Sequence, residues 1–173
     1  MPSGAYGPED LPDIVLTEDR WAPYGFRVDG TLAWIPALEM LLRDGLAERQ
    51  DGDSADGIDL ATLRDALMTK LSTTDAGEYV SWAAVFETVM DSDLAYHYLA
   101  REHQSPDGWG LQPGNSDTEL GWESVLYVGP AHGWNRAGIY LWRWDNLVLA
   151  AVGVGDYDED QLRFMADLME GRR

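Results

Sequence analysis

Residues 137–153 read AGIYLWRWDNLVLAAVG, two apolar runs separated by Asp145 and Asn146. A two-residue turn between such runs is typical of a β-hairpin, and it fixes which residues face each other across the two strands. The pairing places Trp142 opposite Leu149 on one face of the hairpin. Both faces are largely apolar, and this hairpin is the clearest fold signal in the chain.

The segments on either side of the hairpin predict further elements. Asp158 is predicted to cap a helix with an apolar stripe made of Leu162, Met165, Ala166 and Met169. Residues 79–88 alternate as a strand does, with apolar side chains on both faces, which predicts a strand in the middle of a sheet. Ser92 is predicted to cap the next helix, whose apolar residues are Leu94, Ala95, Tyr98 and Leu99.

The N-terminal part predicts two more helices. Residues 31–43 repeat apolar side chains at helical spacing, and a helix from Asp59 is predicted to have Leu60, Leu63, Leu67 and Leu71 on one face. Residues 1–20 are predicted to form an extended arm, since Pro12 restricts the short apolar segment there, and residues 21–173 a single domain. The predicted class is α+β, with an antiparallel β-sheet packed against three to four helices.

Composition limits the function. The chain has 173 residues, and its 31 acidic against 12 basic residues give a formal net charge of -19. A field of that sign repels phosphate backbones and anionic lipids and attracts basic partners, so we expect neither nucleic acid nor a membrane surface as a partner. No run approaches the roughly 18 apolar residues of a membrane span, and no export signal is visible, so the compartment stays open between the cytoplasm and an exported domain without its signal.

The familiar chemical motifs are missing or incomplete. The chain has no cysteine, which excludes disulfides, thiolate nucleophiles and cysteine-bound metals. Residues 153–155 lack the third glycine of a dinucleotide loop and favour a plain strand-to-helix turn, and the acidic loop 51–57 lacks the glycine and glutamate of a calcium loop. His97 and His103 are six residues apart and cannot bind one metal from the same helix face. The sequence therefore predicts no metal, no cofactor and no catalytic residue.

The candidate binding residues lie in and after a long loop. Residues 105–121 are rich in glycine and proline, and loops of that length are usually functional. Tryptophans on such loops either anchor partners and planar ligands or fold back as lids on the core. The candidates are Trp109, Trp122, Trp134, His132, Glu119 and Glu123.

Four segments carry a resemblance to a known group of domains, namely ELGWES at 119–124, WRWDNLV at 142–148, DQL at 160–162 and MADLM at 165–169. Through them the C-terminal third resembles the small exported sensor and lipoprotein domains of actinobacteria. The resemblance implies an antiparallel sheet backed by helices and a non-catalytic role in binding or sensing. It implies no particular site residues.

The sequence thus favours a non-enzymatic binding or sensing domain that recognises a small ligand or a protein through residues 105–136. The alternative is an acidic immunity or inhibitor protein that blocks a basic toxin or enzyme. Association of such an inhibitor would slow steeply with added salt, whereas binding in an apolar cleft would not. A small hydrolase is the third class.

Overall fold

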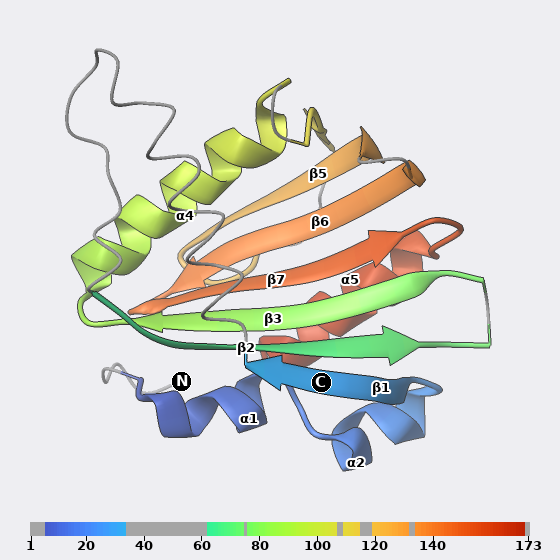
Figure 1. Ribbon diagram of the computed structural model, residues 1–173, viewed down its shortest axis with the longest axis horizontal. Coiled ribbons are helices and arrows are strands. Elements are labelled where there is room, and N and C mark those ends of the chain that lie inside the picture. Colours follow the sequence, from blue (N-terminus) through green and yellow to red (C-terminus); the bar gives the residue numbers. More distant parts are fainter. Residues whose placement is uncertain are drawn as a thin grey trace.

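Seven strands form one antiparallel sheet within the part of the chain that the computed structural model describes, which is residues 6–33, 62–74, 76–106, 109–114, 119–131 and 134–171. The strands are β1 (Arg27–Ala33), β2 (Leu63–Ser72), β3 (Glu78–Phe86), β4 (Gln112–Pro113), β5 (Glu123–Ala131), β6 (Trp134–Trp144) and β7 (Leu147–Val154). Their order across the sheet is β1-β2-β3-β7-β6-β5-β4 (Figure 1). The predicted class, a single α+β domain with an antiparallel sheet packed against helices, is confirmed.

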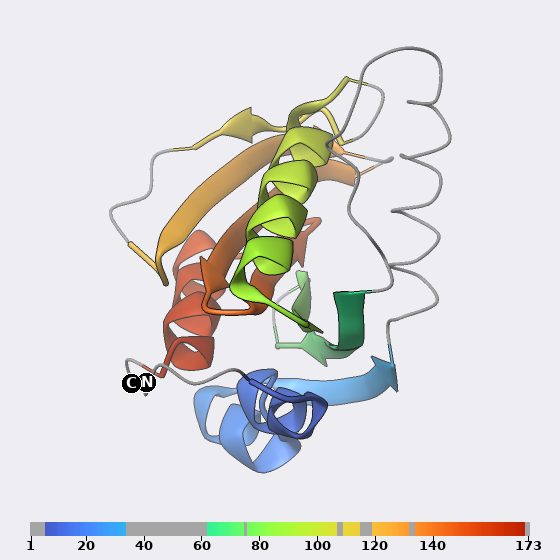
Figure 2. The same cartoon turned by 90° about the vertical axis from the view of Figure 1, so that its left-hand side faces the viewer.

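Short and long helices accompany the sheet. They are η1 (Pro8–Asp10), α1 (Leu11–Ile14), α2 (Glu18–Trp21), η2 (Ala22–Tyr24), α4 (Val89–Gln104) and α5 (Glu159–Met169). In Figure 1, α4 crosses in front of the sheet and α5 lies behind it. Figure 2 shows α1 and α2 gathered at the edge formed by β1. Among the described residues, none of the helices combines the length and apolar character needed to cross a lipid bilayer.

The predicted hairpin is confirmed as β6 and β7. Trp142 pairs with Leu149 and Leu141 with Ala150, as the two-residue turn requires. Asp145 takes a left-handed backbone conformation with φ of 54°, which the tight turn demands and which aspartate tolerates better than most residues. The strand predicted over 79–88 is also confirmed, because β3 pairs with β7 in the interior of the sheet.

The alternation of side chains creates two separate cores, one on each face of the sheet. On one face α1, α2 and α5 cover a core whose large buried residues include Trp21, Tyr79, Trp142 and Met165. On the other face α4 covers a core that includes Trp82, Tyr98, Leu141 and Val148. Since strands β3, β6 and β7 contribute to both cores, they carry apolar side chains on both faces.

The helix predicted from Asp59 is wrong where the structure describes it, because Leu63–Ser72 form strand β2. Residues four apart share a face on a helix and also on a strand, so the leucine spacing fits both structures. Leu67 and Leu71 do share a face and pack into the core with α1. Leu63 packs into the opposite core, beyond a register shift between Leu63 and Asp65.

The N-terminal segment also differs from the prediction. Leu11–Ile14 and Glu18–Trp21 are helical rather than extended, because Pro12 sits in the first turn of α1, where a helix does not need its missing N–H. Buried Trp21 donates its indole N–H to the carbonyl of Val15, at 3.1 Å. The helix predicted over 31–43 is wrong at its start, since Thr31 to Ala33 belong to β1, and the rest of it lies outside the described residues.

Helix caps give one correction and one confirmation. The N-cap of α4 is Thr88 rather than Ser92, because Thr88 and Asp91 form a reciprocal capping box. Ser92 instead lies buried inside the helix and donates to the carbonyl of Asp145, at 2.7 Å. Asp158 caps α5 as predicted, with its carboxylate accepting from the N–H groups of Asp160 and Gln161, and the predicted apolar stripe of that helix is buried.

Candidate functional site

A cluster of charged and aromatic side chains lies where α4 meets the start of β5. We call it the α4–β5 cluster and define it by five residues, namely Asp93, His97, Trp122, Glu123 and Arg143. Asp93 and His97 are one turn apart on α4, Glu123 opens β5, and Arg143 lies directly across from Glu123 on β6. The backbone N–H of Trp122 donates to the carbonyl of Arg143, at 2.8 Å, which fixes the chain entering β5.

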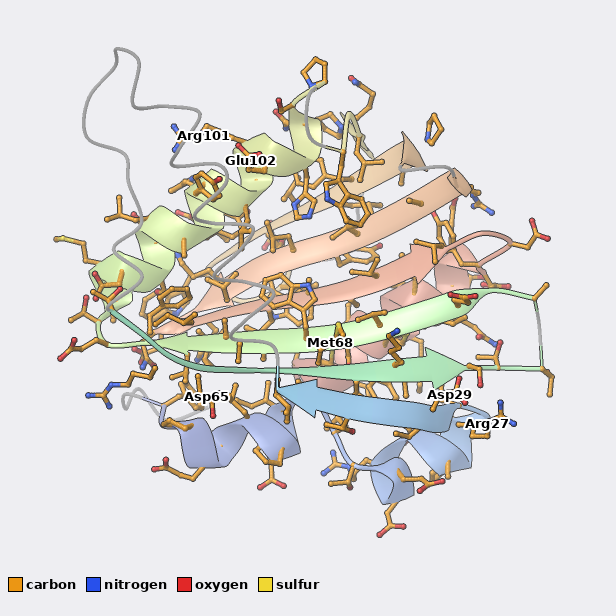
Figure 3. The ribbon with its side chains drawn as sticks, in the orientation of Figure 1. Arg27, Asp29, Asp65, Met68, Arg101 and Glu102 are labelled. Carbon is orange, nitrogen blue, oxygen red and sulfur yellow. The ribbon has the colours of Figure 1, made fainter. Side chains whose placement is uncertain are left out.

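Arg143 is the centre of the cluster. Its guanidinium Nη2 lies 3.0 Å from Asp93 Oδ1 and 3.5 Å from Glu123 Oε1, and its side chain is only 9% exposed. A buried cation must be paired to be tolerated, so the two half-buried carboxylates hold α4 to the sheet through it. By contrast, Arg27 pairs with Asp29 within β1, and the arginine side chain is 76% exposed. Figure 3 shows both side chains at the rim of the sheet.

His97 faces the same two carboxylates from the outside. Its Nε2 lies 3.6 Å from Asp93 Oδ1 and 3.5 Å from Glu123 Oε2. Both distances exceed the 2.7–3.2 Å of an ordinary N–H···O hydrogen bond. The Oε2 atom of Glu123 is shielded from solvent and has no hydrogen-bond partner among the described residues. One carboxylate oxygen therefore faces the imidazole without being bound to it.

Trp122 forms the aromatic wall of the cluster. Half of its side chain is exposed, and the Arg143 guanidinium carbon lies 5.4 Å from its ring centroid, within the range of a cation–π contact. The preceding Gly121 has φ of 56°, and a Cβ there would lie 2.2 Å from the carbonyl oxygen of Arg143. Only glycine fits this turn, so Gly121 determines the position of the Trp122 side chain.

A buried tyrosine, Tyr96, lies beside the cluster. Burial, together with Tyr127 and Glu123, raises the pKa of Tyr96 to about 12, and Arg143 only partly opposes this. The Tyr96 ring lies next to the His97 ring, and their centroids are 5.2 Å apart.

The other residues proposed from the sequence are dispersed. Trp109 is partly buried and packs edge-on against the ring of His103, 5.5 Å away, so it folds back on the core. Glu119 is exposed. Trp134 begins β6, but its side-chain environment lies outside what the structure describes, as does His132 altogether. Of the six candidates, the structure brings Trp122 and Glu123 together.

Sequence reasoning missed Asp93, His97 and Arg143. Arg143 did carry a signal, because it interrupts an otherwise apolar hairpin face and a buried arginine requires acidic partners. Asp93 and His97 share one face of α4 at a spacing of four. Testing His97 as a metal ligand only together with His103 overlooks its pairing with Asp93.

Several grooves border α5. One of about 530 Å³ is lined by residues that include Tyr24, Phe26 and Phe164. Another, of about 120 Å³, includes Leu126 and Tyr140. None of these grooves is lined by any of the six candidate residues. The candidate site is therefore the α4–β5 cluster, which contains Trp122 and Glu123.

No protein-family model and no curated protein sequence matches the chain. A solved structure does, with a TM-score of 0.60 and coverage of 98% of this chain and 97% of the other. The chain is similar in fold to the extracellular domain of PknH from Mycobacterium tuberculosis. At 10% sequence identity the likeness to PknH is one of fold alone. The resemblance to exported actinobacterial domains expected from the C-terminal third is thus confirmed as a fold, and it extends over nearly the whole chain.

Proposed function

We propose that this chain is a non-enzymatic sensing domain that binds a positively charged ligand at the α4–β5 cluster. The observation that carries the proposal is the balance of charge there. The carboxylates of Asp93 and Glu123 converge on a single guanidinium, that of Arg143. The cluster therefore keeps an excess of negative charge at a partly exposed surface, and a cation is the ligand that offsets it.

The surroundings support a cation as ligand. The formal net charge of -19 attracts cations over long range. Trp122 contributes an exposed indole, the side chain that interacts best with cations through its ring face.

The similarity to the extracellular domain of PknH supports the class of function, because it relates this fold to a domain that works outside a cell. One fold can host many functions, so the proposal of a cationic ligand is based on the residues of the cluster. The proposal retains Trp122 and Glu123 from the sequence candidates and adds Asp93 and His97.

The test uses Trp122 as its reporter. The full chain is labelled with 5-fluorotryptophan, the ¹⁹F resonance of Trp122 is assigned with Trp122→Phe, and arginine methyl ester or spermidine is titrated in. We expect these cations to shift the Trp122 resonance, while Nα-acetylcitrulline methyl ester, which carries no charge, does not. The shift should shrink in Glu123→Gln and in Asp93→Asn, and also with added salt.

Glu119→Gln is the matched control, since it removes an exposed acid that lies outside the cluster. The Trp109 resonance serves as an internal control for effects on the fold as a whole. An equal response to uncharged Nα-acetylcitrulline methyl ester would overturn the proposal. It also fails if neither an organic cation nor a divalent metal ion moves the Trp122 resonance.

A further inference from the structure

In the α4–β5 cluster, the imidazole nitrogen of His97 lies at nearly the tetrahedral metal-site separation from two carboxylate oxygens. Zinc lies about 2.0–2.2 Å from imidazole nitrogen and carboxylate oxygen, so neighbouring ligand atoms in a tetrahedral site are roughly 3.3–3.5 Å apart. His97 Nε2 lies 3.6 Å from Asp93 Oδ1 and 3.5 Å from Glu123 Oε2. All three atoms lie within 4.8 Å of one another.

We infer that the positively charged ligand is a divalent transition-metal ion of the zinc class, bound by Asp93, His97 and Glu123. This inference rests on the proposed function, which places a cation at this cluster, and narrows that cation to a metal. The ligand set of one imidazole and two carboxylates suits zinc and cobalt better than magnesium or calcium, which favour oxygen ligands alone.

The state of Glu123 gives a second argument. Its Oε2 atom is out of contact with solvent and lacks a hydrogen-bond partner in the described part of the chain, yet it faces His97. A shielded carboxylate oxygen without a partner is costly. A metal ion between Glu123 and His97 satisfies that oxygen and the imidazole nitrogen together. It would also draw in the second carboxylate, that of Asp93.

Arg143 then acts as an outer partner of the site. It contacts Asp93 Oδ1 and the far oxygen of Glu123, Oε1, and so orients both carboxylates from the protein side. Hydrogen-bonded partners of this kind fix the geometry of metal ligands. Its positive charge also opposes a cation, so both carboxylates are needed for binding.

The ligands come from rigid elements that the fold already holds in place. Asp93 and His97 lie on one face of α4, whose start is fixed by the capping box and by the Ser92 bond to the β6–β7 turn. Glu123 lies in β5, in register with Arg143 on β6. Binding therefore requires adjustments of side chains rather than of the backbone.

The test is calorimetric titration of the full chain with zinc chloride alone. We expect His97→Gln, Asp93→Asn and Glu123→Gln each to weaken zinc binding by about tenfold or more. His97 is exposed and its substitution leaves both cores intact, which circular dichroism should verify. Glu119→Gln is again the control and should bind zinc as the unchanged chain does.

Cobalt chloride provides a second readout, because tetrahedral cobalt absorbs visible light far more strongly than octahedral cobalt. We expect intense bands with the unchanged chain and their loss in His97→Gln. The inference is overturned if the unchanged chain binds no zinc, or if zinc affinity is the same in His97→Gln.

Failure of this inference is distinguishable from failure of the proposed function. If zinc does not bind but arginine methyl ester still shifts the Trp122 resonance, the metal assignment is wrong and a cation-binding surface remains. If neither zinc nor the organic cations bind, both are wrong.

Discussion

The side-chain amide of Asn146 is hydrogen-bonded to both peptide groups of Tyr6, 140 residues away in the chain. Its Oδ1 accepts from the N–H of Tyr6 at 2.8 Å, and its Nδ2 donates to the carbonyl of Tyr6 at 2.9 Å. The same Nδ2 donates to the carbonyl of Phe86 at 2.8 Å. One buried turn residue therefore joins the N-terminal segment, the end of β3 and the β6–β7 turn.

Replacing Asn146 by alanine should lower the free energy of unfolding by about 2 kcal/mol, because the partly buried backbone groups of Tyr6 and the buried carbonyl of Phe86 lose their partners. Urea unfolding followed by circular dichroism measures the change. Asn146→Asp is the informative second variant, since it keeps the acceptor for Tyr6 and loses both donated bonds. An unchanged unfolding midpoint in both variants would show that these bonds contribute nothing to stability.

The ring of Tyr157 lies over the paired glycines Gly138 and Gly153 of the hairpin. A Cβ at Gly153 would lie 2.7 Å from Tyr157 Cγ. We expect Gly153→Ala to cost about 1–3 kcal/mol through this collision, measured by thermal unfolding. Gly30→Ala in β1 is the matched control, because the space around Gly30 is open. Equal stability of the two variants would contradict the packing described.

Burial lowers the pKa of His103 from 6.5 to about 4, although the nearby backbone carbonyl of Leu99 partly opposes this. In the unfolded chain the imidazole takes up a proton near pH 6.5, whereas the folded protein resists protonation until about pH 4. The contribution of His103 to stability is thus complete above pH 6.5 and is lost as the pH falls toward 4. Between pH 7 and pH 5 it amounts to about 2 kcal/mol.

The check is a comparison of the unchanged chain with His103→Phe, whose ring fits between Trp109 and Tyr127 as the imidazole does. Carboxylates that titrate in the same range affect both chains alike. We expect the unfolding free energy of the unchanged chain to fall by about 2 kcal/mol more than that of the variant between pH 7 and pH 5. Parallel pH profiles would refute the assignment.

Asp158 caps α5 through two backbone N–H groups, at 2.7 Å from Asp160 and 3.1 Å from Gln161. Asp158→Ala should destabilise the domain by about 1 kcal/mol. Asp160→Ala removes a charge from the first turn of the same helix without removing the cap, and should cost about half as much. Urea midpoints of the two variants measure the difference, and an equal loss in both would argue against a specific capping role.

The sequence predicted elements that local patterns determine. The β6–β7 hairpin was predicted in register, because a two-residue turn and an alternating pattern leave one alignment. β2 was mistaken for a helix because Leu67 and Leu71 share a face in either structure, and only pairing with β1 and β3 decides between them. A short stretch of sequence does not show which distant strands it will pair with.

The candidate site shows the same limit. Trp122 and Glu123 were found from composition and loop position. Their partners Asp93 and Arg143 come from α4 and β6, and their meeting depends on how α4 packs across the sheet. Arg143 is recognisable in the sequence as a charge on an apolar strand face, and Asp93 by its spacing of four from His97, but the sequence does not show that these residues meet.

The position of β3 beside β7 has a consequence for synthesis of the protein. β1, β2 and β3 leave the ribosome first, but β3 has its inner neighbour only once β7 has emerged. At about 5–20 residues per second, β7 is synthesised several seconds after β3, and during that time β3 has no partner on its β7 side. An apolar strand edge is exposed during this time, so we expect newly made chains truncated before β7 to need chaperones to avoid aggregation.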